Sequence, residues 1–338
     1  MNAPTNATTT APRVTVIILT WNRPDDVVTC LESFADVDYP NLEVLVVDNH
    51  SADNTVEIVR ERFPWATLIV NDDNLGYVGG NNVGIRYALG QGTDYVFVLN
   101  SDTKMTQPCL PELVRTMQSD PRIAIAGAKN LYMQNPAFTW GKYGKLTWGP
   151  MLCTTHGRFV RDYPEPSPQD VDWIIGNGCM MSREALERVG IFDEEFFQVN
   201  EDVDWCIRAR KAGYRCVYVD TAAIHHRGAS SADLSQPIIF SYGYFLGRNA
   251  ILFAKKHANP LQFAWLLSMM VLGLTMRMSA FALSSTLRAI FGQEPFISGM
   301  IDGIAGRLRR EKITMRKPVY SGEPPDTPVV RILRWLGA

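Results

Sequence analysis

The sequence predicts an α/β protein in which helices cover both faces of a mostly parallel sheet. Short runs of β-branched and other apolar residues alternate with amphipathic stretches at the spacing of strand–helix units. The strand runs are continuously apolar, which is typical of strands buried on both faces. A chain of 338 residues with 46% hydrophobic and 20% charged residues is also long enough to enclose a sizeable core.

The elements can be followed in order from Val14. The run VTVIIL (14–19) is short and β-branched and predicts a buried strand, and a helix begins after Pro24. Ser51 or Asp53 is expected to cap the next helix. Further strands are expected at 42–47, 67–70, 95–99, 123–126 and 216–219. Helices are expected at 25–34, 52–63, 80–89, 111–118 and 203–212.

Polar residues follow four of these strands, at the edge where the strands end. Ligands of parallel sheets bind outside the carboxyl ends of the strands, so this edge is the expected binding site. The residues are Thr20 to Arg23, Asp48 and Asn49, 71–74, and Asn100 to Asp102. Turn formation explains why Asn, Ser and Asp follow one strand, but chance would scatter polar residues over both edges.

A dinucleotide-binding enzyme is not expected. That site needs the pattern G-x-G-x-x-G directly after the first strand, whereas the segment 20–26 contains no glycine. The glycines come after the third strand instead, in GYVGGNNVG (76–84), where backbone N–H groups before a helix could face a phosphate. The same cluster also fits an ordinary flexible loop.

Several blocks occur in an order that resembles a known family. They are VIILTWNRP, VLVVDNHSADNT, NDDNLGYVGGNNVGI, VFVLNSDT, GNGCMMSREALERVGIFDEEFF, NEDVDWCIRARKAGYRCVYV and IHHRGASS, and they run from about Val14 to about Ser231. Together they resemble glycosyltransferase family 2, most closely its rhamnosyltransferase-like branch. The resemblance implies a GT-A fold with a Rossmann-like sheet over 13–233, of which 13–130 binds the nucleotide sugar and 131–233 binds the acceptor.

The resemblance also implies a donor site with Mg²⁺ or Mn²⁺. Asp102 is the carboxylate expected to meet the metal, and Asn100 stands where the family's D-x-D motif has its first Asp. One carboxylate with substrate phosphates suffices for Mg²⁺, which keeps much of its hydration. Asp48 matches the position that accepts a hydrogen bond from a pyrimidine ring, with helix capping as the alternative. The other implied donor-binding residues are Thr20, Asn22, Asn74, Gly76, Gly79, Gly80 and Asn82.

The family's catalytic base corresponds to the pair Glu201-Asp202. A carboxylate within reach of the acceptor hydroxyl can accept its proton during displacement, so Asp202 is the expected base and Glu201 an orienting group. Two acids at a helix start could also only favour the helix dipole. His225 is implied as a further metal or diphosphate ligand, with a structural role as the alternative. The implied acceptor wall consists of Trp173, Gly176, Asn177 and Gly178.

A basic, apolar segment follows at 234–310. From Leu234 to Gln293 there are five basic residues and no acidic ones, although the whole chain has a formal net charge of −2. The stretch 263–287 is long enough to span a bilayer, but Arg277 near its middle makes a helix lying on an anionic membrane surface the favoured interpretation. A packed subdomain or a homodimer interface is the alternative. Residues 1–12 and 311–338 are expected to be tails.

These features predict an inverting, metal-dependent glycosyltransferase on the cytoplasmic face of the cell membrane. The expected donor is a dTDP- or UDP-sugar, with rhamnose as the candidate sugar, and the acceptor is a polysaccharide or lipid-linked glycan. A nucleotidyltransferase is an alternative that lacks a basic phosphate loop, and a catalytically silent scaffold is another. The net charge gives no reason to expect nucleic acid. Six cysteines without a C-x-x-C pair are expected to be reduced thiols.

Overall fold

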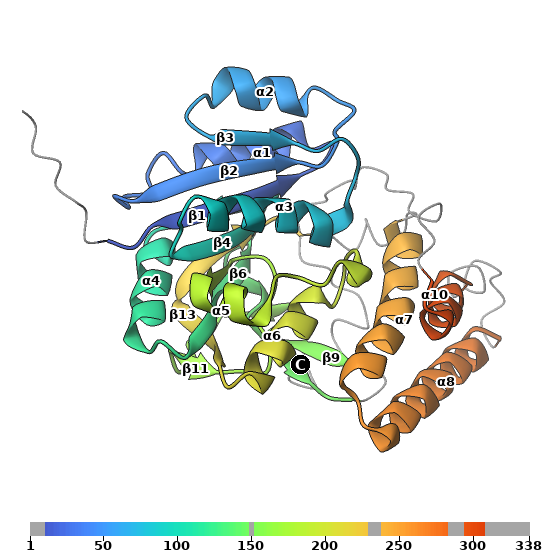
Figure 1. Cartoon of the computed structure of the whole chain (residues 1–338). Helices are drawn as coiled ribbons and strands as arrows, with labels where there is room; N and C mark the ends of the chain where they lie inside the picture. The colour runs from blue at the N-terminus through green and yellow to red at the C-terminus, as the bar shows by residue number, and fades with distance from the viewer. Residues whose placement is uncertain (1–10, 149–151, 229–237, 283–293, 308–338) are drawn as a thin grey trace, which may run out of the picture.

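The computed structural model describes residues 11–148, 152–228, 238–282 and 294–307. Within these residues, a large mixed sheet forms the centre and helices lie on both of its faces (Figure 1). One face is covered by α1 (Pro24–Glu32), α2 (Thr55–Arg62) and α4 (Cys109–Ser119). The other is covered by α3 (Gly76–Gly90), α5 (Arg183–Val189) and α6 (Glu201–Lys211). The predicted α/β fold class is confirmed.

The strands of the N-terminal half are all parallel. β1 (Val14–Thr20) lies between β2 (Leu42–Asp48) and β4 (Tyr95–Asn100), and β3 (Thr67–Val70) pairs with β2. Side chains of β1 alternate between the two cores: Val16 and Ile18 pack on the α1 side and Ile17 packs on the α3 side. Each strand predicted for this half is present.

Beyond β4 the sheet becomes mixed. β12 (Cys179–Ser182) runs antiparallel between β4 and β6 (Ile123–Tyr132). β13 (Arg215–His226) runs parallel to β6 and pairs antiparallel with β5 (Thr103–Met105). Short strands complete this half: β7 (Phe138–Gly141), β8 (Tyr143–Leu146), β9 (Cys153–His156), β10 (Val160–Arg161) and β11 (Gln169–Asp170). The sequence did not predict these short strands, because runs of two to four residues carry little periodic signal.

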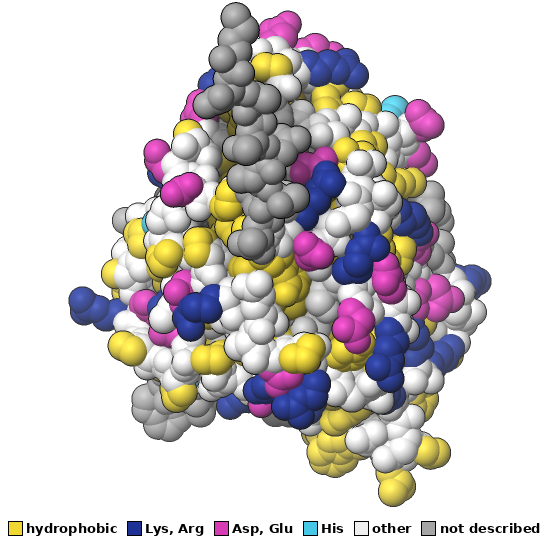
Figure 2. Space-filling view, turned by 60° about the vertical axis from the view of Figure 1, so that its left-hand side comes forward, with side chains coloured by type: hydrophobic (Ala, Val, Ile, Leu, Met, Phe, Trp, Pro, Cys, Tyr) yellow, Lys and Arg dark blue, Asp and Glu magenta, His cyan; other side chains and the backbone are white. Residues whose placement is uncertain are grey.

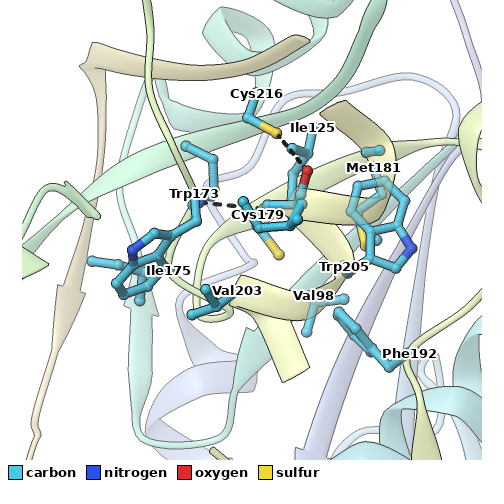
Figure 3. Close-up of a cluster of buried hydrophobic side chains, with 14 of the residues drawn as sticks. Val98, Ile125, Trp173, Ile175, Cys179, Met181, Phe192, Val203, Trp205 and Cys216 are labelled. Atoms are coloured by element: carbon cyan, nitrogen blue, oxygen red, sulfur yellow. Dashed lines mark hydrogen bonds between the residues drawn. The ribbon is translucent and has the colours of Figure 1, made fainter. Parts of the chain in front are cut away.

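The core beside β12 is closely packed. Figure 3 shows Trp205, Met181 and Ile125 among the buried side chains there. All six cysteines of the chain are free, as predicted, and five are buried. Burial raises the pKa of the Cys179 thiol, which disfavours the reactive thiolate.

The C-terminal helices pack onto this domain and onto each other. They are α7 (Ile238–His257), α8 (Pro260–Ala282) and α10 (Glu294–Ala305). Phe253 of α7 belongs to the same buried cluster as the strand residue Val98, and Phe245 stacks on Phe197 with ring centroids 5.5 Å apart. α10 lies along α7, where Gly303 leaves room for the Arg248 backbone.

None of the helices in the described ranges combines the length and hydropathy needed to cross a membrane. The packing of α7 agrees with the subdomain alternative for the first part of the segment 234–310. The expected stretch 283–287, the tail 311–338 and residues 1–10 of the expected N-terminal tail lie outside the described residues.

Charges of both signs are interspersed on the described surface. Figure 2 shows lysine, arginine and acidic side chains mixed over the face that it presents. A protein surface that binds nucleic acid carries a basic patch or stripe.

A buried charge network in the second half offers a test of stability. Lys142 is fully buried, and its Nζ donates to the Tyr163 carbonyl at 2.6 Å and to Glu165 at 3.0 Å. K142M would leave Glu165 without this partner, and breaking a buried pair costs about 3–5 kcal/mol of unfolding free energy. Urea unfolding measures the change.

The exposed pair of Arg115 and Glu112 supplies the control. R115M should change the unfolding free energy by less than about 1 kcal/mol, because solvent screens such pairs. Equal effects of K142M and R115M would contradict the structural role of Lys142.

Candidate functional site

The carboxyl ends of β1, β2 and β4 lie side by side. In the sheet Thr20 pairs with Asp48, and Leu19 pairs with Asn100. The polar residues that follow these strands therefore gather at one edge, as the sequence predicts.

Thr20, Asn22 and Asp48 form the first part of this edge. Asp48 is fully buried, and its carboxylate accepts hydrogen bonds from the N–H and the hydroxyl of Ser51 at 2.8 and 2.5 Å. Asn22 accepts from the Ala52 N–H at 2.7 Å. Thr20 Oγ1 is buried and has no hydrogen-bond partner in the described residues. Asp48 thus holds the turn after β2 and does not cap α2, which begins at Thr55 after Asn54, and a pyrimidine contact would use its remaining lone pairs.

The glycine-rich block lies inside a helix, which corrects the predicted start at residue 80. α3 begins at Gly76, and a Cβ on Gly80 would come within 2.4 Å of the Leu19 side chain. A Cβ on Gly84 would come within 2.6 Å of Ile17. These glycines let α3 lie close against β1. They are therefore not the ordinary flexible loop that the sequence also allowed, and their contact with a phosphate stays a prediction.

Three other residues of this block also have structural partners. Asn74 Oδ1 accepts from Asn49 at 2.8 Å and from the Gly76 N–H at 2.9 Å. Asn82 is fully buried and bonds the backbone of Phe192. Gly79 packs against Leu75. These contacts position the loop and α3, and the donor contacts of the three residues stay a prediction.

Asp102 faces His226 at the end of β4. Asp102 Oδ1 lies 3.2 Å from His226 Nε2, with the two side chains 19% and 6% exposed. His226 Nδ1 and Asn100 Oδ1 are buried, and within the described chain neither has a hydrogen-bond partner. Burial by itself would raise the pKa of Asp102, but the charges of His226, Arg23 and Arg227 outweigh it and leave the pKa below the ordinary value.

His226, and not the predicted His225, lies next to Asp102. Side chains of adjacent strand residues point to opposite faces, and β13 directs His226 toward Asp102. His225 is paired in the sheet with Lys104, and burial together with the charge of Lys104 lowers the pKa of His225. Because side chains alternate along a strand, the register of β13 decides which of the two histidines faces Asp102.

The donor set at Asp102 fits a divalent cation that takes most of its ligands from substrate and water. No group of three or more His, Cys, Asp or Glu side chains in the described ranges could hold a metal unaided. Asp102 and His226 are two suitable ligands, and the orphaned Asn100 oxygen is a hard acceptor beside them. A protein site of this kind is completed by diphosphate oxygens.

Two arginines lie next to this site. Asp26 is 4% exposed and lies 2.8 Å from Arg227 and 3.1 Å from Arg23. The charges of both arginines also lower the pKa of Asp102. The environment is therefore suited to an anionic ligand. Arg23 is among the polar residues that the sequence predicts at this edge, whereas Arg227 was not singled out, although it stands in the block IHHRGASS.

The second carboxylate pair, Glu201-Asp202, lies at the start of α6. Asp202 Oδ2 accepts from the Gly176 N–H at 2.9 Å and Oδ1 from the Val203 N–H at 2.8 Å. Burial raises the pKa of Asp202 to about 6 despite these bonds. Glu201 is 5% exposed with an orphaned Oε2, and burial plus the Asp202 charge raise its pKa well above the ordinary value. With a pKa of about 6, Asp202 is ionised at neutral pH.

Tyr77 links the two halves of the site. Its hydroxyl donates to the Gly176 carbonyl at 3.2 Å. Burial raises the pKa of Tyr77, and the charges of Glu201, Asp202 and Asp102 raise it further. Tyr77 and Asp202 therefore both bond the backbone of Gly176. Sequence reasoning missed Tyr77, because a tyrosine inside a glycine-rich block carries no pattern of its own.

The residues predicted as an acceptor wall have other positions. Trp173 is 6% exposed and lies in the core, where Figure 3 shows it near Ile175 and Val203. A Cβ on Gly144 would lie 1.7 Å from its indole, so the ring packs against that glycine. The wall assignment of Trp173 is wrong because the ring is covered.

The turn at 176–178 forms hydrogen bonds with both parts of the site. Asn177 Oδ1 accepts from the Asn100 N–H at 2.9 Å and from the Thr103 hydroxyl at 3.1 Å. Gly176 donates to Asp202, and Gly178 has φ 79° with no space for a Cβ beside Ile224. This turn connects the Asn100–Asp102 loop to Asp202, which is a positioning role and not the predicted acceptor wall.

Known proteins resemble the chain over most of this region. A family model described as Glycosyl transferase family 2 matches residues 15–190, just over half of the chain. The N-acetylglucosaminyl-diphospho-decaprenol L-rhamnosyltransferase of Mycobacterium tuberculosis is 31% identical over 214 residues, covering 56% of this chain and 68% of that protein. The dTDP-rhamnosyl transferase RfbF of Shigella flexneri is 25% identical over 275 residues, covering 79% and 87%.

Solved structures share the fold. The crystal structure of GalNAc-T7 with UDP, GalNAc and Mn²⁺ aligns with a TM-score of 0.56 at 13% identity. The alignment covers 79% of this chain and 58% of that one, so this chain spans less than two thirds of that protein. At this identity the likeness shows the fold alone, which is the GT-A arrangement.

Proposed function

The chain belongs to glycosyl transferase family 2 and is a glycosyltransferase, and we propose that it transfers rhamnose from dTDP-rhamnose to a lipid-linked glycan with inversion. One observation carries the mechanism. One turn connects the two carboxylates: the Gly176 N–H donates to Asp202, and Asn177 accepts from the Asn100 N–H in the loop that carries Asp102. Transfer needs these two groups, one for the acceptor proton and one for the donor diphosphate.

On the donor side, Asp102 and His226 would hold a divalent cation with the diphosphate, and the Asn100 oxygen would accept from a bound water or ribose hydroxyl. Such a cation stabilises the negative charge that develops on the departing nucleoside diphosphate. Arg23 and Arg227 add positive charge to the same place. The structure therefore supports leaving-group stabilisation by the side chains at the ends of β4 and β13.

On the acceptor side, Asp202 is the base. The acceptor hydroxyl oxygen attacks the anomeric carbon as the carbon–oxygen bond to the diphosphate breaks, and the hydroxyl proton passes to the Asp202 carboxylate. The bond from the Gly176 N–H fixes that carboxylate. Burial raises the pKa of Glu201 and favours its protonated form, which can donate a hydrogen bond to the acceptor or to Asp202. One displacement inverts the anomeric centre.

The names of the relatives support the choice of donor and acceptor. One is a rhamnosyltransferase acting on a diphospho-decaprenol compound and the other is a dTDP-rhamnosyl transferase. We therefore place the enzyme peripherally on the inner face of the membrane. α8 offers a surface for this contact, because Leu261, Trp265 and Val271 are 82%, 54% and 53% exposed.

Removing this apolar surface should weaken membrane binding. Burying a large apolar side chain contributes about 1.5–3 kcal/mol, so L261S/W265S is expected to reduce flotation with anionic vesicles by at least about tenfold. Trp65 is equally exposed at 54% and lies between α2 and β3, so W65S is the matched control. If the wild type does not float, or if L261S/W265S dissociates a dimer instead, the membrane assignment fails.

Ligand binding tests the donor assignment. Thermal unfolding should shift upward with dTDP or UDP in the presence of Mn²⁺ or Mg²⁺, and shift less after EDTA treatment, because only the folded state binds. Screening dTDP-, UDP- and GDP-sugars then ranks the donors. If no nucleotide binds in any metal condition, the donor site at Asp102 is wrong.

A further inference from the structure

The loop that precedes the catalytic pair has an unfavourable backbone. Phe197, Val199 and Asn200 have φ angles of 61°, 71° and 71°. This left-handed region is costly for residues with a Cβ and most of all for a β-branched valine. Such a conformation persists only where surrounding contacts enforce it.

Two adjacent residues of α7 supply those contacts. Asn249 Nδ2 lies 2.9 Å from the Phe196 carbonyl, 2.6 Å from that of Gln198 and 2.7 Å from that of Val199. Arg248 Nη1 donates to the Glu195 carbonyl and to Asn249 Oδ1, both at 2.7 Å. Asn249 is fully buried and Arg248 is 5% exposed, so no water can replace these donors without moving α7.

The same loop contacts both halves of the site. The Phe197 carbonyl accepts from the Val78 N–H at 2.9 Å, next to Tyr77 at the start of α3. The Asn200 carbonyl accepts from the Asp204 N–H at 2.9 Å and so begins α6. The loop conformation therefore sets where the first residues of α6, including Asp202, lie relative to α3.

The far end of α7 also contacts α6. His257 Nε2 lies 2.7 Å from Asp204 Oδ1, and Lys256 Nζ lies 3.2 Å from the same oxygen. α7 thus contacts the loop before α6 through Asn249 and the first turn of α6 through His257. A helix that only covered the core would not need two sets of buried polar contacts.

We propose that Asn249, supported by Arg248, is a positioning residue that fixes Asp202 by enforcing the left-handed loop at 197–200. The proposal rests on the proposed function, in which Asp202 is the base. It assigns a catalytic contribution to the C-terminal segment, since α7 lies outside the residues 15–190 that the family model matches.

Kinetics of N249A and N249S test the proposal. Both variants should lower kcat at least tenfold and leave the donor Kd within about twofold, because the donor site at Asp102 is not touched. N249S keeps one hydrogen-bond donor and should therefore retain more activity than N249A. N249D places a carboxylate against three carbonyl oxygens and should therefore retain less activity than N249A. If N249A does not fold, N249S and N249D provide the comparison.

A matched control separates positioning from folding. Tyr244 is buried on α7 in the same cluster as Phe197, but Y244F keeps its ring and removes only the hydroxyl, which bonds Asp302 of α10 at 3.1 Å. Y244F should lower thermal stability and leave kcat unchanged. If Y244F and N249S reduce kcat alike, the effect is general destabilisation and the proposal is overturned.

A double mutant distinguishes this proposal from the proposed function. With D202N in place, adding N249S should cost no further activity, because there is no base left to position. If D202N alone leaves turnover intact, the base assignment fails. If D202N abolishes turnover but N249S does not change kcat, only the positioning role of Asn249 fails.

Discussion

Replacing Asp202 with Asn is expected to lower turnover by about 10²- to 10⁴-fold, the usual contribution of a general base. The amide cannot accept the acceptor proton, and donor binding at Asp102 should persist. Asp202 accepts bonds from the Gly176 and Val203 N–H groups, and an amide can satisfy only one of them. Thermal unfolding should accompany the kinetics to confirm that D202N is folded.

The pH dependence of turnover gives a second readout of Asp202. Its pKa is raised to about 6 by burial, so the carboxylate is ionised above pH 6 and protonated below it. Turnover should rise with pH up to about 6 and level off above, with a tenfold loss per unit on the acid side. The acid limb should disappear from the residual activity of D202N.

Glu201→Gln is the matched control for this residue. Burial and the Asp202 charge raise the pKa of Glu201 well above the ordinary value and so favour its neutral form, which Gln resembles. The neutral amide should therefore keep far more activity than D202N does. If E201Q is the more damaging variant and D202N keeps its acid limb, Glu201 is the base and the assignment of Asp202 is wrong.

Replacing Asp102 with Asn is expected to weaken donor and metal binding together. The loss of a charge-assisted contact costs about 2–4 kcal/mol, which is about 30- to 1,000-fold in donor affinity. Calorimetric titration of dTDP with and without Mn²⁺ measures it. The metal dependence of binding should be reduced in D102N, because no carboxylate remains beside His226.

Two adjacent histidines provide the control for this site. H226A should weaken metal-dependent binding by at least about tenfold, because His226 lies 3.2 Å from Asp102. H225A should leave binding nearly unchanged, because that ring is on the opposite side of β13 next to Lys104. The reverse order of effects would restore His225 as the ligand.

The sequence predicted the N-terminal half of the fold well, because each strand there is a continuous apolar run. β1, β2 and β4 end in the polar residues that meet at the site. The antiparallel insertion of β12 between β4 and β6 was not predictable from four residues, CMMS. The order of the strands in the sheet depends on pairings between segments that are distant in the sequence, and local patterns do not encode such pairings.

The candidate site was predicted in part. The edge of the sheet and the pairing of Asp102 with a histidine followed from the motifs, but the choice between His225 and His226 depended on strand register. Trp173 was misassigned because a tryptophan that binds a sugar and one that fills a core look alike in sequence. Its packing against Gly144 comes from a bridge between distant segments.

The role of α7 could not be read from the sequence at all. Its composition, apolar and basic without acids, favoured a membrane surface, whereas Arg248 and Asn249 point into the domain. The loop that they hold has no glycine at its three left-handed positions. The conformational preferences of these residues therefore do not predict the left-handed conformation.

The most direct test of the central claim is transfer itself. Purified protein is incubated with dTDP-rhamnose and a polyprenyl-diphosphate-linked N-acetylglucosamine, and release of dTDP is followed with Mn²⁺ and after EDTA. The account predicts dTDP release that requires the acceptor and the metal, with a glycosylated lipid of inverted anomeric configuration as product. Absence of release with dTDP-, UDP- and GDP-sugars alike, or a product with retained configuration, would contradict it.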